Sequence, residues 1–155
     1  MSDTALLDAS GVAKSFGAVR ALTNARLQLA EGEIVALMGA NGAGKSTFVK
    51  IITGALKPDR GHVLIRGREA RVGNPAQARQ SGLVPVYQEP SLIPDLDVRD
   101  NLRLIDTPVD GFRHWVSELG IKRLEPSSMI RDLPLATLRI IDLARALAAR
   151  PDVLL

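Results

Sequence analysis

The chain has 155 residues, about one domain, and 46% of them are hydrophobic, which is enough for a packed core. Its 20 basic and 17 acidic residues leave a net charge of +3, which does not favour nucleic-acid binding, and the lack of cysteine excludes disulfides and thiolate metal sites. The first ten residues do not resemble a signal peptide and no apolar run approaches the ~20 residues of a membrane span, so we expect a soluble, cytoplasmic chain.

The first third of the chain predicts strands, a loop and a helix. Residues 6–12 and the alternating apolar residues of 25–29 predict two short strands. Residues 34–38 form a continuous apolar run, which is typical of a strand buried on both faces of a parallel sheet. A glycine-rich loop follows, and then a helix for which Gly54 is the expected C-terminal cap.

The middle of the chain continues this alternation. Residues 62–65 and 83–87 predict two further strands. Asn74 and Pro75 are expected to begin a short helix between them, which ends near Gly82. Alternating strands and helices are the signature of an α/β core.

From residue 89 to residue 131 the sequence predicts only helices and loops. One helix begins near Val98 with Asp97 as its N-cap, and another spans about residues 112–119. This segment is therefore expected to form a helical subdomain inserted into the α/β core.

The most specific motif follows the apolar run at 34–38. It fits the phosphate-binding pattern G-x-x-x-x-G-K-[ST], in which backbone N–H groups point at phosphate oxygens. Lys45 would reach the β- and γ-phosphates and Ser46 would ligate Mg²⁺. The alternative is a glycine-rich turn that happens to contain a lysine, and a nucleoside triphosphate is the favoured interpretation. The predicted nucleotide-binding residues of this loop are Gly39, Ala40, Asn41, Gly42, Ala43, Gly44, Lys45, Ser46 and Thr47.

Three segments together resemble the ATP-binding domain of ABC transporters. They are KSFGAVRAL at 14–22, the loop at 39–47, and VYQEPSLIPDLDVRDNL at 86–102. The third is similar to ATPases that drive bacterial importers of the ribose, galactose, xylose and rhamnose type. The resemblance covers residues 6–155, which correspond to the first two-thirds of such a domain.

The resemblance implies an α/β fold, a P-loop NTPase core of the ABC ATPase type with an inserted helical subdomain. The expected parts are an ATP-binding core at 6–88, a helical subdomain at 89–134, and a signature helix with the start of the Walker B strand at 135–155. In the family, the residues that follow this start supply the magnesium-site aspartate and the catalytic glutamate. These carboxylates and the later switch histidine are not among the 155 residues, so no catalytic residue is assigned and ATP binding without turnover is expected.

Two further residues match functional positions of the family. Phe16 matches the aromatic residue that stacks on adenine; the alternative is a core aromatic near a strand end. Gln88 matches the glutamine that touches Mg²⁺ and the attacking water; the alternative is a polar residue that closes a buried strand. Residues 89–102 would belong to the surface that docks on the membrane subunit, unless they form an ordinary solvated loop.

The segment before the last helix resembles a degenerate ABC signature. In the family this signature reads Leu-Ser-Gly-Gly-Gln or Leu-Ser-Val-Gly-Gln, and it contacts the γ-phosphate bound by the opposite domain of a head-to-tail dimer. Here Pro134 removes a hydroxyl and an N–H, Ala136 adds a methyl, and Thr137 keeps a hydroxyl but loses the amide. The helix itself should survive, because proline is tolerated in a first turn. The degenerate signature comprises Leu133, Pro134, Leu135, Ala136 and Thr137.

The function implied is the ATP-binding component of an importer that couples ATP hydrolysis to uptake of a sugar, with ATP and Mg²⁺ as cofactors. The implied partners are a second ABC ATPase domain, membrane permease subunits and, indirectly, a periplasmic solute-binding protein, but no nucleic acid. Such a protein is peripheral on the inner face of the cell membrane. The alternatives are a non-transport ABC ATPase and a nucleotide-binding module without enzyme activity. A P-loop kinase or GTPase is disfavoured, since no guanine-reading Asn-Lys-x-Asp motif is present.

Other conspicuous residues have simpler interpretations. His62 and His114 are isolated, so metal or acid–base roles are not favoured. Trp115, Val116 and Leu119 recur at helical spacing and are interpreted as core. Several arginines of the helical segment are interpreted as a solvated surface, with an anionic partner as the lesser alternative. These are Arg99, Arg103, Arg113, Arg123 and Arg131.

Overall fold

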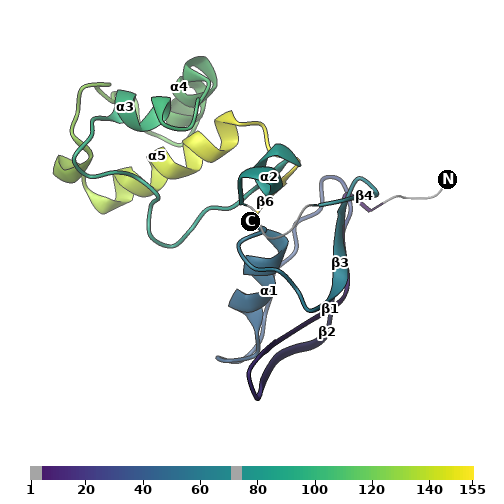
Figure 1. Cartoon of the computed structure of the whole chain (residues 1–155). Helices are drawn as coiled ribbons and strands as arrows, with labels where there is room; N and C mark the ends of the chain where they lie inside the picture. Colours follow the sequence, from purple (N-terminus) through teal and green to yellow (C-terminus); the bar gives the residue numbers. More distant parts are fainter. Residues whose placement is uncertain (1–4, 71–74) are drawn as a thin grey trace. The chain divides into compact units, whose positions relative to one another are not determined.

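The computed structural model describes residues 5–70 and 75–155. They form two compact units, one that ends at Val84 and also contains Leu155, and one that runs from Pro85 to Leu154 (Figure 1). Asn74, the expected start of a helix, lies outside the described residues. Across the two described ranges, no helix is long and apolar enough to cross a membrane.

The first unit is built on an antiparallel sheet with the order β2-β1-β3-β4. Its strands are β1 (Leu7–Phe16), β2 (Val19–Leu29), β3 (Arg60–Ile65) and β4 (Arg68–Glu69). β1 and β2 form a hairpin, and β3 pairs with the other edge of β1. The strands predicted at 6–12, 25–29 and 62–65 are confirmed, and each is longer than predicted.

One face of this sheet is packed against a helix. Leu7, Ala9 and Val63 are fully buried, and they share a face because side chains alternate along a strand and Ala9 pairs with Val63. The helix α1 (Lys45–Ile52) contacts β1 and β2. The C-cap of α1 is Thr53, one residue before the predicted Gly54, and Gly54 follows it with the positive φ of 74° that is typical of a glycine ending a helix. The buried residues of α1 are Phe48, Ile51 and Ile52.

The apolar run at residues 34–38 is not a strand, so the prediction of a buried strand there is wrong. Ile34 is 98% exposed and Met38 is 85% exposed. A central strand of a parallel sheet is stable only when strands on both sides pair with its N–H and C=O groups. No described residue pairs with the backbone of this run, which therefore has a strand-like sequence without the neighbours that a strand requires.

The last elements of the first unit are short. They are α2 (Pro75–Gln80) and β5 (Leu83–Val84). The strand predicted to reach Tyr87 ends at Val84. Pro85 follows directly and has no N–H to continue a ladder of hydrogen bonds, which explains the early end.

The second unit is helical. It contains α3 (Val98–Arg103), α4 (Val109–Glu118), the 3₁₀ turn η1 (Ile130–Asp132), α5 (Leu135–Ala148) and the short strand β6 (Val153–Leu154). The helices predicted near Val98 and at 112–119 are thus confirmed in type. α5 packs against α4.

The core of this unit lies between α3, α4 and α5. Trp115 and Leu119 pack against it, which confirms their interpretation as core residues together with Val116. Asp97 caps α3, since its Oδ1 accepts a hydrogen bond from the N–H of Asp100 at 2.8 Å. The buried cluster consists of Val98, Leu102, Phe112, Val116, Ile130, Ile141, Ala144 and Ala148.

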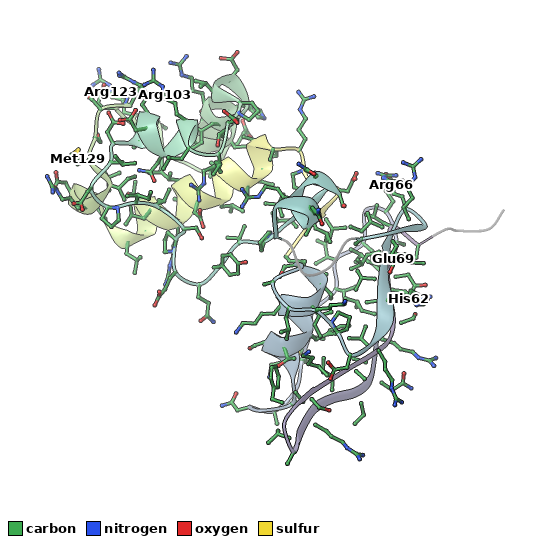
Figure 2. All side chains as sticks on the ribbon, in the orientation of Figure 1. His62, Arg66, Glu69, Arg103, Arg123 and Met129 are labelled. Atoms are coloured by element: carbon green, nitrogen blue, oxygen red, sulfur yellow. The ribbon has the colours of Figure 1, made fainter. Side chains whose placement is uncertain are left out.

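Neither histidine of the chain lies in a metal site that the structure describes. His62 is exposed on β3 (Figure 2), and His114 lies edge-on to Trp115 with ring centroids 5.2 Å apart. Within residues 5–70 and 75–155, no group of three His, Cys, Asp or Glu residues is placed to hold an ion.

Candidate functional site

The glycine-rich loop is held against the β-hairpin by close backbone contact. Gly44 is the N-cap of α1 and has a φ of 86°, a left-handed conformation that favours glycine. A Cβ at this position would lie 2.5 Å from the carbonyl oxygen of Ala21 and 2.7 Å from Cδ2 of Leu22. Only glycine therefore fits where the loop meets β2.

The first turn of α1 presents free hydrogen-bond donors. The N–H of Phe48 donates to the carbonyl of Gly44 at 2.8 Å, which is the first bond of the helix. Among the described residues none accepts a hydrogen bond from the N–H groups of Lys45, Ser46 or Thr47. These donors and the positive end of the helix dipole point the same way, so the turn can bind an anion.

The side chain of Lys45 folds back over the loop that precedes it. Its Nζ donates to the carbonyl oxygens of Gly39 at 2.6 Å and Ala40 at 2.8 Å. An ammonium group has three donors, so it can keep a carbonyl contact while it takes up a phosphate oxygen. Lys45 therefore supports the loop when no anion is bound, and its ammonium group can add positive charge beside an anion at this turn.

Phe16 lies at the end of β1, opposite Val19, and is 51% exposed. A core aromatic would be buried, so the structure argues against that alternative. Lys14, two residues before Phe16, pairs with Leu22, whose side chain lies against Gly44. The Nζ of Lys14 lies 5.9 Å from the ring centroid of Phe16, which adds a favourable cation–π contact.

Asp59 fixes this end of β1, and sequence reasoning missed it. Its Oδ1 accepts from Nζ of Lys14 at 2.7 Å, and its Oδ2 accepts from the N–H of Ser15 at 2.8 Å. The hydrogen bond from Lys14 is the main cause that lowers the pKa of the Asp59 carboxyl below its ordinary 3.8. The turn before β3 was predicted, but nothing local indicates that its aspartate reaches a strand more than forty residues earlier.

Gln88 belongs to the second unit, where it is exposed in an irregular segment. It does not close a buried strand, because β5 ends at Val84. Two buried polar residues anchor the chain that follows it. Asn101 accepts from the N–H of Ile93 at 2.7 Å and donates to the carbonyl of Ile93 at 3.1 Å. Arg145 donates to the carbonyl of Ser91 at 2.7 Å.

Arg145 is itself held by a buried ion pair with Asp142. Its Nη2 lies 2.6 Å from Oδ1 of Asp142, and the two side chains are only 9% and 7% exposed. Both residues lie on α5, three positions apart. The segment after Gln88 is thus tied to α5 by a buried cation. Sequence reasoning missed Asn101, Asp142 and Arg145, since their partners cannot be read from local spacing.

The segment at 133–137 begins α5 without a side-chain cap. Pro134 is the N-cap, with a φ of −59° and a ψ of 147°, and the carbonyl of Pro134 accepts the first helical bond from Leu138. The prediction that the helix survives the proline is confirmed. Leu135 and Ala136 are exposed at its first turn, which therefore presents two apolar side chains.

The sequence of the chain is similar to those of known proteins. A protein-family model described as "ABC transporter" matches residues 22–155. A ribose import ATP-binding protein of Mesorhizobium japonicum is 38% identical over 161 residues, which cover 97% of this chain and 31% of that protein. A ribose import ATP-binding protein of Streptomyces avermitilis is 39% identical over 156 residues, covering 93% of this chain and 31% of its own length.

The fold of the chain is also similar to that of a solved protein. The chain superimposes on a solved ATP-binding cassette of an ABC transporter in its ADP conformation with a TM-score of 0.84 and 23% identity. That match covers 97% of this chain and 67% of the other. The predicted α/β class with an inserted helical subdomain is thereby confirmed. The chain spans about a third of the length of the curated relatives it matches.

Proposed function

Because the chain belongs to the ABC transporter family of ATP-binding proteins, we propose that it forms the nucleotide-binding part of an ATPase that drives import of a sugar. The observation that carries this proposal is the loop before α1. The first turn of α1 that follows it has three N–H groups without an acceptor among the described residues, and the Lys45 ammonium group lies over the loop. The names of the ribose import relatives support a sugar as the transported substrate.

The residues of the loop fit ATP and Mg²⁺. The segment from Gly39 to Thr47 contains no carboxylate that would repel phosphate, and the space beside Gly42 is open. The hydroxyl of Ser46 has no partner among the described residues, so it is free to ligate the metal. Mg²⁺ bound there would neutralise charge on the β- and γ-phosphates.

Phe16 would hold the adenine by stacking. Its ring is half exposed at the end of the hairpin that carries the loop, and the ion pair of Lys14 with Asp59 fixes the backbone beneath it. Stacking on an exposed ring needs no further rearrangement of the core. This contact orients the base while the loop binds the phosphates.

We propose that residues 133–137 form a weak signature face. Pro134 offers neither a hydroxyl nor an N–H, and Leu135 and Ala136 are exposed and apolar at the start of α5. With a second ABC ATPase domain as partner, the two composite sites would be unequal. Further proposed partners are permease subunits, with a periplasmic solute-binding protein acting through them, so the protein would work at the inner face of the membrane.

We also propose that the 155-residue chain binds ATP without turnover. None of its residues is assigned a catalytic role, and phosphoryl transfer depends on groups that position water and metal. The proposed parts are the ATP-binding core at 6–88, the helical subdomain at 89–134, and the signature helix with the following strand at 135–155.

Equilibrium binding of a fluorescent ATP analogue to the chain tests this proposal. Lys45→Ala should weaken binding by about tenfold to a hundredfold, the value of a charge-assisted hydrogen bond. Lys50→Ala, which removes a charge from the exposed side of the same helix, is the matched control and should leave binding unchanged. Equal binding by both variants would refute the proposed site, and multiple-turnover phosphate release would refute the lack of turnover.

A further inference from the structure

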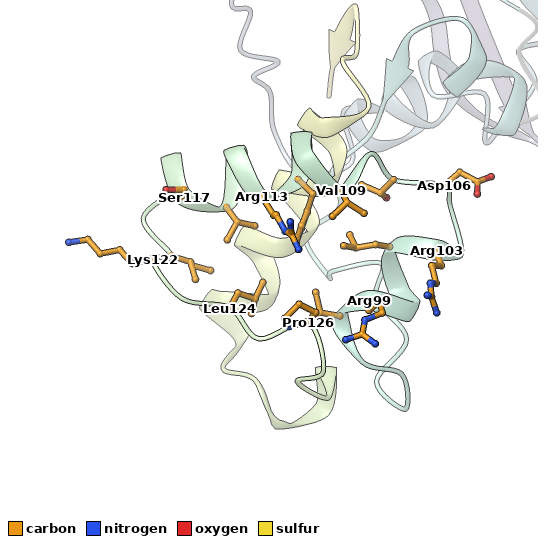
Figure 3. A pocket seen from close by; sticks show the side chains of 15 residues that line it. Arg99, Arg103, Asp106, Val109, Arg113, Ser117, Lys122, Leu124 and Pro126 are labelled. Carbon is orange, nitrogen blue, oxygen red and sulfur yellow. The ribbon is translucent and has the colours of Figure 1, made fainter.

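The helical unit contains a cavity of about 770 Å³ between α3, α4 and the loop that follows α4 (Figure 3). Its floor is made by the core residues Val98, Leu102, Phe112 and Val116. Small-molecule sites are typically clefts of about 300–1,000 Å³ with apolar walls and a few polar groups. The size and lining of this cavity are therefore those of a ligand site.

The rim of the cavity is strongly cationic. Its lining includes Arg99, Arg103, Arg113 and Lys122, against the single carboxylate of Asp106. Arg103 is paired with a neighbour on α3, but the other three cations have no ion-pair partner within the part of the chain that the structure describes. In Figure 3 Arg113 lies near the centre of the lining, whereas Arg103 and Lys122 extend outward at opposite sides. Unpaired cations beside an apolar floor favour an anion with an apolar body.

A buried hydroxyl in the wall is also unsatisfied. Thr107 lines the cavity and is 9% exposed, and its Oγ1 has no hydrogen-bond partner among the described residues. Buried polar groups are nearly always paired, because an unmade hydrogen bond is costly. Thr107 is therefore a buried polar group of the wall that lacks a hydrogen-bond partner among the described residues.

The walls are held in place without a ligand. The N–H of Val98 donates to the carbonyl of Ser128 at 3.0 Å, and the N–H of Arg99 donates to the carbonyl of Pro126 at 3.0 Å. These bonds tie the start of α3 to the far end of the loop after α4. The cavity is thus preformed, which lowers the entropic cost of binding.

We propose that this cavity binds a small amphipathic anion, with its apolar body on the floor and a carboxylate or phosphate group at Arg99 and Arg113. The residues of this site are distinct from those of the nucleotide loop, so the proposal does not depend on ATP binding. A ligand there joins α3 to α4. Because Asn101 on α3 holds Ile93, occupancy of the cavity stabilises the segment that follows Gln88.

Calorimetric titration of the chain with decanoate, below its micellar concentration, tests the proposal. Decanol is the uncharged comparison. We expect saturable binding of one decanoate per chain and at least about tenfold weaker binding of decanol, since several cations act on the head group. The variant R99Q/R113Q should bind decanoate about tenfold more weakly.

The control variant is R123Q/R139Q, which removes two exposed arginines of the same unit that do not line the cavity. It should bind within about twofold of the unchanged chain, as surface charges at this distance are screened. Circular dichroism melts establish that both variants fold, which is expected since all four arginines are exposed. Amide shifts on decanoate addition should occur at Thr107 and Val116.

Each of four results would overturn the proposal. The first is no saturable binding of decanoate, and the second is equal affinity for decanol. The third is equal loss of affinity in the two double variants, and the fourth is amide shifts confined to the exposed apolar run at 34–38. That last pattern would mean adsorption on exposed apolar surface rather than binding in the cavity.

Discussion

Substitution of Asp142 by Asn is expected to destabilise the helical unit strongly. The side chain keeps its shape but loses its charge, so the change isolates the ion pair with Arg145. Both partners are more than nine-tenths buried and 2.6 Å apart. The guanidinium of Arg145 would remain in the core with only the carbonyl of Ser91 as a described acceptor.

The size of the effect follows from this burial. Removal of one partner of a buried ion pair costs about 3–5 kcal/mol, because the remaining charge stays desolvated. We expect about 3 kcal/mol here, the lower end, since Ser91 still accepts a hydrogen bond from Arg145. The unit spans about 70 residues, and at roughly 0.05–0.15 kcal/mol per residue this loss is a large part of its free energy of unfolding.

The chain has a built-in probe for the measurement. Trp115 is its only tryptophan, and it packs on the core of the helical unit. Its fluorescence during urea unfolding therefore reports this unit, with a shift of the midpoint by about 1–3 M for the expected loss. The matched control is Arg103→Gln, which removes an ion pair of the same helical spacing that is exposed and should cost under about 0.5 kcal/mol.

A double variant makes the reasoning refutable. Replacing Asp142 by Leu and Arg145 by Met removes both charges and should be close to neutral, because two apolar side chains fill the same space. A loss below about 1 kcal/mol for Asp142→Asn would mean that Arg145 is hydrated. An equal loss for the double variant would mean that packing, and not the unpaired charge, governs stability.

Four further outcomes are expected. Gly44→Ala should cost more than about 2 kcal/mol in denaturation and abolish ATP binding, whereas Gly42→Ala, which has a similar positive φ but open space around it, should cost only about 1 kcal/mol. Because folding lowers the pKa of Asp59, this carboxylate stabilises the fold above pH 3.8, and the stabilisation is lost as the pH falls through the pKa of the folded state. Unfolding curves below pH 4 should show this loss of stability in the unchanged chain and not in Asp59→Asn. Thr107→Val should raise the free energy of unfolding by about 1 kcal/mol, since it removes an unsatisfied buried hydroxyl, and a lower melting temperature would contradict this. Pro134→Ser should stabilise α5 by about 1 kcal/mol in the same Trp115 assay by supplying a cap, and no change would mean that the first turn is already satisfied.

The parts of the fold that follow from local sequence were predictable. Alternation at 25–29, the cap at Asp97 and the glycine after α1 each depend on residues a few positions apart, and the structure confirms them. The prediction of a strand at 34–38 was wrong because an apolar sequence favours burial but does not provide neighbouring strands to pair with. The early end of β5 could have been read from Pro85, whose missing N–H is a local signal.

The residues of the candidate site also differ in whether the local sequence reveals them. The loop around Lys45 is recognisable because all its donors come from one short segment. Asn101 and Arg145 are not, because they bond to backbone groups 8 and 54 positions away. Asp59 is similar, since its partners lie across the sheet. The role of a buried polar residue depends on its partners in the tertiary structure, and sequence periodicity does not reveal those partners.

We expect the exposed run at 34–38 to favour association between copies of the chain in concentrated solution. Its five uncharged residues contain no proline, and no described residue satisfies their backbone groups. Such a segment is a template for intermolecular β-pairing, in which copies stack through the same edge and shield each other's apolar side chains. Because this association depends on encounters between chains, dilution protects the monomer, and a lysine in place of Leu37 would act as a gatekeeper against fibril growth.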